Sequence, residues 1–333
     1  MIAILSNSAL ATVQDQGRLG SLRYGVGTSG AMDPLALLAA NLMLGNDENA
    51  AAIEVPVFPF QVKFTADCAF AISGADCAAK LDDTPLLPWS VYQARADQVL
   101  RLAPPQSIAG PATLRSSRAY LALAGGIDVP VVLESRATQM RGNFGGHEGR
   151  PLQRGDCLRA LEPGMGTRPV GFGIVPPAVS MPQQVDGVNA IRVLPAAQYE
   201  NFTEASRTAF WSTPWKITAQ SDRYGYRLAG ENIVPIAPME ILSHGIVPGV
   251  IQVPHGGQPI IQMRDAQPSG GYPKFGTVID ADMWRLGQAP IGSQIRFIET
   301  TWDAATAALT QLQDWRSELQ RLIDLQRWSH GRS

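Results

Sequence analysis

The chain has 333 residues, enough for two ordinary domains, and its composition of 45% apolar and 17% charged residues is that of a globular protein. A formal net charge of −2 without any basic block excludes the cationic surface that a nucleic acid needs. No apolar run approaches the ~18 residues of a membrane-spanning helix. Three cysteines without a CxxC pair, and no signal-peptide pattern at the start, predict a cytoplasmic protein.

The first recognisable element follows a glycine-rich loop. GVGTSG at 25–30 matches G-x-G-x-x-G, but no buried strand precedes it and the chain does not go on to alternate strands with helices. We therefore interpret these glycines as a loop leading to a buried helix over 34–44. Asp33 is its expected N-cap and Gly45 its expected C-terminal glycine. Free N–H groups at the helix start leave an anion there as the alternative role.

Short apolar or alternating runs dominate the rest of the chain. Gly, Pro, Asp and Asn separate them roughly every 8–12 residues, a spacing typical of β-sandwiches and barrels. We predict strands within 53–64, 69–73, 90–95, 98–102, 118–124, 191–194, 215–220, 239–243, 250–254, 259–264, 275–280 and 294–299.

A second helix is predicted near the end, from about 303 to 328, because apolar residues recur there at helical spacing. The Pro- and Gly-rich stretch 161–188 is the best candidate for a domain boundary. We expect a mainly β protein with barrel-like halves over 1–180 and 181–300 and an amphipathic helix over 301–333. A glycine pair followed by two strands closes each half and suggests a weak internal duplication.

Two loops of the first half carry candidate polar groups. QDQGR at 14–18 presents Asp15 and Arg18 together, either to bind a ligand or to fix a turn. GNFGGHEGR at 142–150 could form an anion-binding nest of backbone N–H groups, with His147 and Glu148 available for acid–base work. Its alternative is a glycine-rich turn with solvated side chains.

Two loops of the second half also carry candidate polar groups. RDAQPSGGYPKFG at 264–276 combines two cations, a carboxylate and a glycine pair, which suits a phosphate with a metal, or a carboxylated intermediate. Its alternative is a wide hairpin with surface charges. In SDRYGYRLAG, Arg223 and Arg227 would share one face of a strand and clamp an anion, unless both are solvated.

Several known motifs are absent. There is no G-x-x-x-x-G-K-[ST], H-E-x-x-H or G-x-S-x-G, and the four histidines are scattered. We expect no zinc site, and the identity of any metal stays unknown.

Taken together, the segments resemble a known family. TVQDQGRLG, SGAMD, AANLMLGN, AISGAD, YLALAGGIDVP, SDRYGYRLAG, EILSHGIVPGVIQVPHGGQPI, DAQPSGGYPKFGTVI and LGQAPIG occur in order, as does an isolated Glu54. They resemble the KipA family, also called allophanate hydrolase subunit 2 or subdomain A/B of biotin-dependent carboxyltransferases. Its members are similar to the PxpC subunit of bacterial 5-oxoprolinase and to part of urea carboxylase.

The resemblance implies two linked cyclophilin-like β-barrel domains and a hetero-oligomer. It implies a KipI/PxpB-like partner subunit, a PxpA (LamB/YcsF-like) subunit and a small-molecule substrate. Where the family has Q-T-T-G-G, this chain has Gln267-Pro268-Ser269-Gly270-Gly271, a change that bears on substrate contacts.

The implied activity is that of a subunit of an ATP-dependent hydrolase that opens the lactam of 5-oxoproline to L-glutamate. ATP with Mg²⁺ would act at the level of the complex. One alternative is a carboxyltransferase component of a urea or amide carboxylase, with biotin carried on another chain because no A-M-K-M stretch occurs here. The other alternative is a non-catalytic regulator that binds a KipI-like kinase inhibitor.

We divide the candidate site residues by role. Arg18, Arg223 and Lys274 are assigned to anion clamping. The candidates for catalysis are Asp15, Asp33, Glu54, Asp265 and Lys274. The candidates for binding substrate or an anion are Gln14, Arg18, Gly145, Gly146, Arg150, Arg223, Gln252, Gln267, Gly270, Gly271 and Tyr272.

Overall fold

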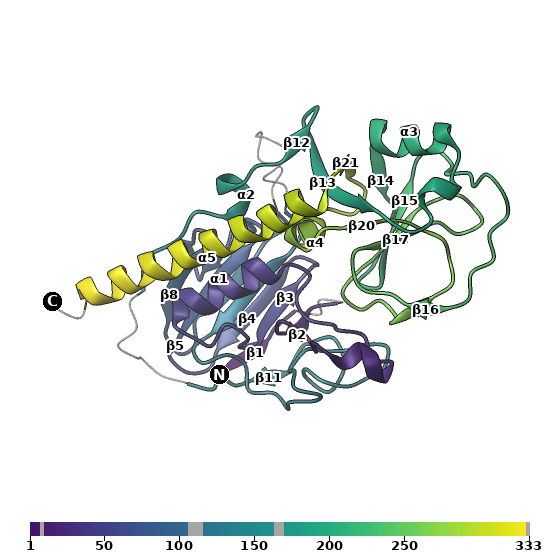
Figure 1. The fold of residues 1–333 in the computed structure, drawn as a ribbon. Coiled ribbons are helices and arrows are strands. Elements are labelled where there is room, and N and C mark those ends of the chain that lie inside the picture. Colours follow the sequence, from purple (N-terminus) through teal and green to yellow (C-terminus); the bar gives the residue numbers. More distant parts are fainter. Residues whose placement is uncertain (7–9, 106–115, 163–169, 331–333) are drawn as a thin grey trace.

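The structure is a computed structural model that describes residues 1–6, 10–105, 116–162 and 170–330. The predicted mainly β architecture is confirmed, with one closed barrel and a long C-terminal helix. Figure 1 shows the first half of the chain in purple and blue and the barrel of the second half in green. None of the described helices has the length and apolarity needed to cross a lipid bilayer.

The first half contains two antiparallel sheets. Their orders are β11-β1-β4-β9-β6-β7 and β2-β3-β10-β5-β8. Both contribute to one apolar core, in which the rings of Phe64 and Phe70 lie 5.0 Å apart. The strands are β1 (Ile2–Ile4), β2 (Thr12–Gln14), β3 (Ala52–Val55), β4 (Phe60–Phe64), β5 (Cys68–Gly74), β6 (Lys80–Leu81), β7 (Thr84–Pro85), β8 (Ser90–Ala94), β9 (Val99–Leu102), β10 (Ala119–Leu123) and β11 (Cys157–Leu158).

Helix α1 (Pro34–Leu44) has the predicted bounds and packs on the five-stranded sheet. The Asp33 carboxylate caps it by accepting the N–H groups of Leu35 and Ala36, each at 3.0 Å. The cap interpretation is therefore confirmed, and this carboxylate takes the place that an anion would have at the helix start.

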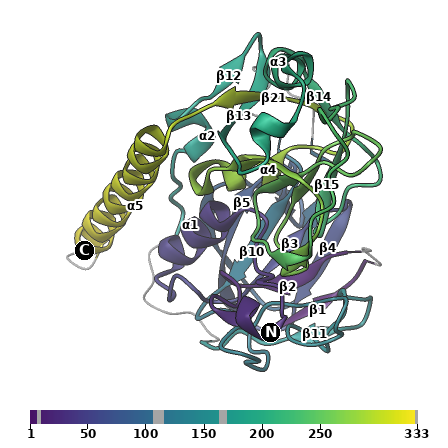
Figure 2. The same cartoon turned by 45° about the vertical axis from the view of Figure 1, so that its right-hand side comes forward.

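Helix α5 (Trp302–His330) lies along the outside of α1, as both views show (Figures 1 and 2). Its Leu319 and Ile323 enter the core of the first half. The Arg327 guanidinium donates to the Leu42 carbonyl at the end of α1. The C-terminal helix predicted from apolar spacing is confirmed, and one of its faces is used within this chain.

The second half forms a barrel of seven strands in the order β13-β20-β17-β18-β15-β14-β21, closed by the parallel pairing of β13 with β21. Stacked rings of Phe210 and Phe297, 4.5 Å apart, lie in its core. The strands are β12 (Gln184–Val185), β13 (Val188–Pro195), β14 (Trp215–Ile217), β15 (Gly225–Ala229), β17 (Val250–Gln252), β18 (Ile260–Gln262), β20 (Lys274–Val278) and β21 (Gln294–Glu299). A separate ribbon pairs β16 (His244–Gly245) with β19 (Ser269–Gly270).

Short helices lie between the strands, and none of them was predicted. They are η1 (Ser21–Tyr24), α2 (Pro177–Ser180), η3 (Tyr199–Asn201), α3 (Glu204–Ser212), η4 (Asp280–Asp282) and α4 (Met283–Gln288). Of the predicted boundary 161–188, residues 163–169 lie outside the described residues. The division at residue 180 stays a prediction.

Two strand predictions were wrong in detail. The run 53–64 is two strands in different sheets, because Pro56 and Pro59 cannot donate to a ladder and the chain turns between them. The run 239–243 has an apolar, strand-like sequence but forms no strand.

Candidate functional site

The four candidate loops meet where the two halves of the chain touch. The Ser29 N–H donates to the Arg264 carbonyl at 2.9 Å, and Arg223 Nη2 donates to the Gly30 carbonyl at 2.7 Å. The Arg18 guanidinium lies 4.8 Å from the centre of the Phe144 ring. Loops that are far apart in the sequence therefore share one place in the fold.

The glycines of GVGTSG allow these loops to pack closely against one another. A Cβ atom on Gly27 would lie 2.9 Å from the Ala266 carbonyl oxygen, and one on Gly30 would lie 2.7 Å from the Gly17 nitrogen. Gly30 also has a φ of +87°, which favours glycine. The glycines allow close backbone approach, in agreement with the loop interpretation.

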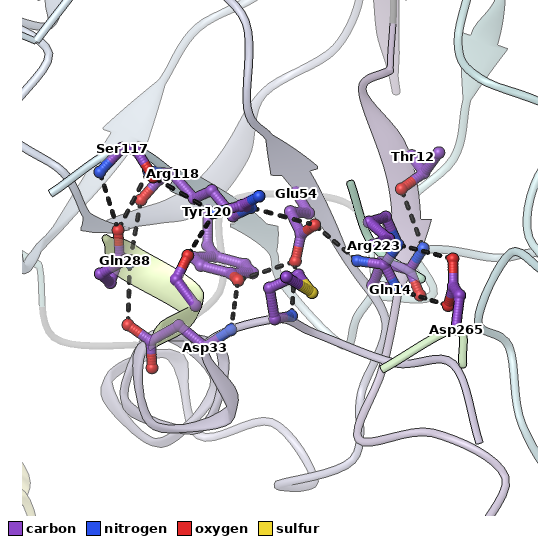
Figure 3. Close-up of polar contacts among 12 residues, drawn as sticks. Thr12, Gln14, Asp33, Glu54, Ser117, Arg118, Tyr120, Arg223, Asp265 and Gln288 are labelled. Carbon is purple, nitrogen blue, oxygen red and sulfur yellow. Dashed lines mark hydrogen bonds and ion pairs between the residues drawn. The ribbon is translucent and has the colours of Figure 1, made fainter. Parts of the chain in front are cut away.

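Arg223 is the centre of a buried ion-pair network (Figure 3). Its Nε and Nη2 donate to the two oxygens of Asp265 at 2.9 and 3.0 Å, and its Nη1 donates to Glu54 Oε1 at 2.6 Å. Glu54 Oε2 accepts the Tyr120 hydroxyl and the Met32 N–H, both at 2.8 Å. Burial raises the pKa of Glu54, but the charges of Arg223 and Arg118 outweigh it and lower this pKa overall.

Asp33 lies at the other end of the network. Its second oxygen accepts Gln288 Nε2 at 2.8 Å, and its own N–H donates to the Tyr120 hydroxyl. Burial raises the pKa of Asp33 to about 6 in spite of its hydrogen bonds. Arg118 reaches across to the Tyr226 hydroxyl at 3.0 Å.

We call this set the junction network: Asp33, Glu54, Arg118, Tyr120, Arg223, Asp265 and Gln288. Its members come from both halves of the chain, and all are buried. Protein donors bind every carboxylate of the junction network, and several of these bonds join the two halves of the chain. The network therefore fixes the two halves to each other.

The polar side chains Gln14, Asp15 and Arg18 of the QDQGR loop are also buried and hydrogen-bonded within the protein. Asp15 accepts hydrogen bonds from the Gly17 N–H, the Ser135 hydroxyl and the Arg136 N–H. Gln14 accepts the Gly30 N–H. Arg18 donates to two backbone carbonyls and is not ion-paired with Asp15 at 4 Å. These side chains hold neighbouring loops, but the Asp15–Arg18 pair of the turn-fixing alternative does not form.

Arg150 lies apart from the junction network. It donates to both oxygens of Asp156 at 2.8 and 3.0 Å and to Glu148 at 2.7 Å. Its hydrogen bonds lower the pKa of Asp156 to about 2. Gly145 and Gly146 have positive φ values and leave no room for a Cβ, and the Gly146 N–H donates to the Arg136 carbonyl. This loop is a tightly packed turn.

The remaining candidates gather at one end of the barrel. We call them the barrel-end cluster: Gln252, Gln267, Gly270, Gly271, Tyr272 and Lys274. Lys274 is half-buried at the start of β20, and its Nζ lies 3.4 Å from the Gly245 carbonyl oxygen. It forms no ion pair with any residue that the structure describes, and burial lowers its pKa. Tyr272 is 44% exposed and Gln267 is exposed.

Gln252 ties this cluster together. It is buried, accepts Gln262 Nε2 at 3.1 Å and donates to the Tyr272 carbonyl at 3.5 Å. A Cβ on Gly270 would lie 2.5 Å from Gln252 Nε2, so a larger residue there would displace the Gln252 amide. The cluster therefore presents the Lys274 cation, the Tyr272 phenol and the Gln267 amide near solvent, a set able to bind a carboxylate or phosphate.

Arg223 and Arg227 do not share a strand face, contrary to our expectation. Strand β15 begins at Gly225, so Arg223 precedes it and points into the junction network, whereas Arg227 is exposed. Sequence reasoning missed Arg118, Tyr120 and Gln288, because an apolar strand and an unpredicted helix carry them. Among the described residues, no three His, Cys, Asp or Glu side chains form a group able to hold a metal.

Comparison with known proteins decides the family. Residues 24–299 match the family model described as carboxyltransferase domain, subdomain A and B. The chain belongs to this family. The 5-oxoprolinase C-subunit of Escherichia coli is 41% identical over 96% of this chain and 97% of that protein. The protein of the same name from Haemophilus influenzae is 38% identical over 97% of this chain and 99% of that protein.

A solved structure supports the fold. The chain superposes on the urea amidolyase of K. lactis with a TM-score of 0.83 and 26% identity, over 97% of this chain but only 20% of that one. In that relative, the family's fold is one part of a much longer polypeptide. The resemblance inferred from the sequence motifs is thus confirmed at the level of the family.

Proposed function

We propose that this chain is a subunit of an ATP-dependent 5-oxoprolinase, acting with a KipI/PxpB-like and a PxpA-like subunit to hydrolyse 5-oxoproline to L-glutamate. The observation that carries the proposal is 41% identity along nearly the whole length of a relative named as the C-subunit of 5-oxoprolinase. The similarity to urea amidolyases, at 31% identity or less, supports the carboxyltransferase alternative more weakly.

The carbonyl carbon of the 5-oxoproline lactam is a poor electrophile and must be activated. A lactam carbonyl resists attack by water. ATP would phosphorylate its oxygen and release ADP, water would add at the activated carbon, and the ring C–N bond would break as the nitrogen takes a proton. A second water would then hydrolyse the resulting acyl phosphate to the carboxylate of glutamate and free phosphate. Asp15, Glu54 and Asp265 have their oxygens taken by protein donors and do not fit a Mg²⁺ site. We therefore derive no step through the nucleotide or the metal in this chain.

The barrel-end cluster is the part of this chain best suited to contact substrate. The Lys274 ammonium has no carboxylate partner among the described residues and would attract the carboxylate of 5-oxoproline. Tyr272 would orient the bound molecule, and the buried Gln252 would hold the Tyr272 backbone through its carbonyl. The junction network fixes one end of the loop that leads to Gly270, because Arg223 holds both oxygens of Asp265 at the start of that loop.

Reconstitution tests this function. The purified chain is mixed with the two partner subunits, ATP, Mg²⁺ and 5-oxoproline, and ADP and glutamate are measured. We expect both products in equal amounts, and neither when this chain is omitted. Biotin-dependent bicarbonate fixation without glutamate would favour the carboxyltransferase alternative. Tight partner binding without turnover would favour the regulator.

A further inference from the structure

An apolar segment of the second half is unusually exposed. Residues 234–247, with the sequence VPIAPMEILSHGIV, connect β15 to β17. Leu242 is 91% exposed and Ile236 is 67% exposed, and Val234 and Val247 are about half exposed. Single exposed apolar residues are common, but several along one short segment mark an interaction surface.

The backbone in the middle of this segment is unpaired as well. Within the described chain, residues 237–242 make no hydrogen bond to another backbone group, although the sequence predicts a strand over 239–243. Met239 packs against the barrel core and holds the segment to the protein. Unpaired backbone beside apolar side chains is what an added strand from another polypeptide would satisfy.

The segment also borders the barrel-end cluster. Strand β16, at its end, pairs with β19, so that Gly245 lies beside Ser269. The Lys274 ammonium contacts the Gly245 carbonyl, and the Ile241 carbonyl oxygen lies 2.8 Å from where a Cβ on Gly271 would be. A polypeptide bound to 237–242 would therefore lie next to Lys274 and Tyr272.

Charge argues against a second copy of this chain as the occupant. Glu240 is the single charged residue in the segment and is exposed. A two-fold antiparallel pairing centred on Glu240 would place two Glu240 carboxylates directly opposite each other on one face, which is unfavourable. Moreover, the full-length relatives are named as one subunit of a larger enzyme.

We propose that residues 236–242 are the docking edge for a partner subunit. The partner pairs an edge strand with 237–242, buries Ile236 and Leu242, places a cation opposite Glu240 and completes the site around Lys274. This inference rests on the proposed function for the identity of the partner, but the surface itself is argued from the exposed residues and the unpaired backbone.

The test compares Leu242→Asp with Leu87→Asp. Leu87 is 72% exposed in the first half, so both substitutions place a carboxylate on the surface without disturbing a core. Each purified variant is titrated with the fluorescently labelled KipI/PxpB-like and PxpA-like subunits in turn. For at least one of them, Leu242→Asp should raise the dissociation constant at least tenfold and Leu87→Asp should leave it within twofold. Amide hydrogen exchange of 237–242 should slow in the complex.

The outcomes separate the two proposals. Turnover of 5-oxoproline with wild-type affinity for both partners in Leu242→Asp would overturn the docking edge and leave the function intact. Failure of the wild-type chain to bind either partner would overturn both. A homodimer of this chain that Leu242→Asp dissociates would assign the edge to a second copy and contradict the proposal.

Discussion

Removing Arg223 should destabilise the protein more than removing almost any other arginine. Arg223→Ala leaves Glu54 and Asp265 buried without the cation that holds them, and both are about 1% exposed. Breaking a buried ion pair by deleting one partner costs about 3–5 kcal/mol. That is a large share of the ~5–15 kcal/mol by which a folded domain is stable.

The sign of the pH dependence follows from Glu54. In the wild type its pKa is held below the ordinary 4.5, so its contribution to stability is present above that value and is lost as the pH falls through the lowered pKa. In Arg223→Ala the cation is gone, burial then raises the pKa of Glu54, and protonation of this carboxylate removes the cost of its buried charge. The stability gap between the two proteins should therefore be smaller at pH 5 than at pH 8.

Urea unfolding at both pH values measures the effect, with Arg227→Ala as the control. Arg227 lies four residues away and is exposed on β15, so its loss should cost no more than about 0.5 kcal/mol. A loss below about 1 kcal/mol for Arg223→Ala, or equal losses for the two variants, would refute the ion-pair account.

Three further predictions concern stability. Burial raises the pKa of Asp33 from 3.8 to about 6, so its charge lowers the free energy of unfolding progressively as the pH rises from 4 to 7. Asp33→Asn should remove this pH dependence, which amounts to up to about 3 kcal/mol, when the free energy of unfolding is measured against pH. Gly145→Ala should lower the melting temperature clearly more than Gly155→Ala, because both have positive φ but only the first clashes; equal shifts would contradict this. Ile323→Ala should cost about 2–4 kcal/mol and the half-exposed Leu322→Ala under 1 kcal/mol; equal losses for these two would mean that α5 does not pack on the body.

Local signals were enough to predict a helix whose sequence contains its own start and stop residues. Helix α1 has a capping Asp33 and a terminal Gly45, and both act within a few residues of the chain. Helix α3 has a capping Thr203 but no terminal glycine, and α4 has no side-chain cap and no terminal glycine, so packing on the barrel decides both. Residues 239–243 have strand chemistry, but a strand also needs a neighbour, and within the described chain none is supplied.

The candidate loops meet, but the candidate residues divide among the junction network, the QDQGR loop, the turn that holds Arg150 and the barrel-end cluster. Their environments could not be read from the sequence. Arg223 meets Glu54, 169 residues away, and Asp265, 42 residues away. A charged residue that will be buried and paired has the same letter as one that will face solvent. Only the fold separates the junction network from the half-buried Lys274, which has no carboxylate partner in the part of the chain that the structure describes. Their roles as catalytic or binding groups stay predictions that substitution tests.

The most direct test of the account is turnover by Lys274→Ala in the reconstituted complex, with Lys216→Ala, an exposed lysine on β14, as the control. Affinity for the partner subunits is measured alongside, so that assembly and turnover are separated. We predict that Lys274→Ala assembles normally and loses at least about 100-fold in glutamate formation, as expected for a lost charged contact to substrate, while Lys216→Ala matches the wild type. Wild-type turnover by Lys274→Ala would contradict the placement of substrate at the barrel end.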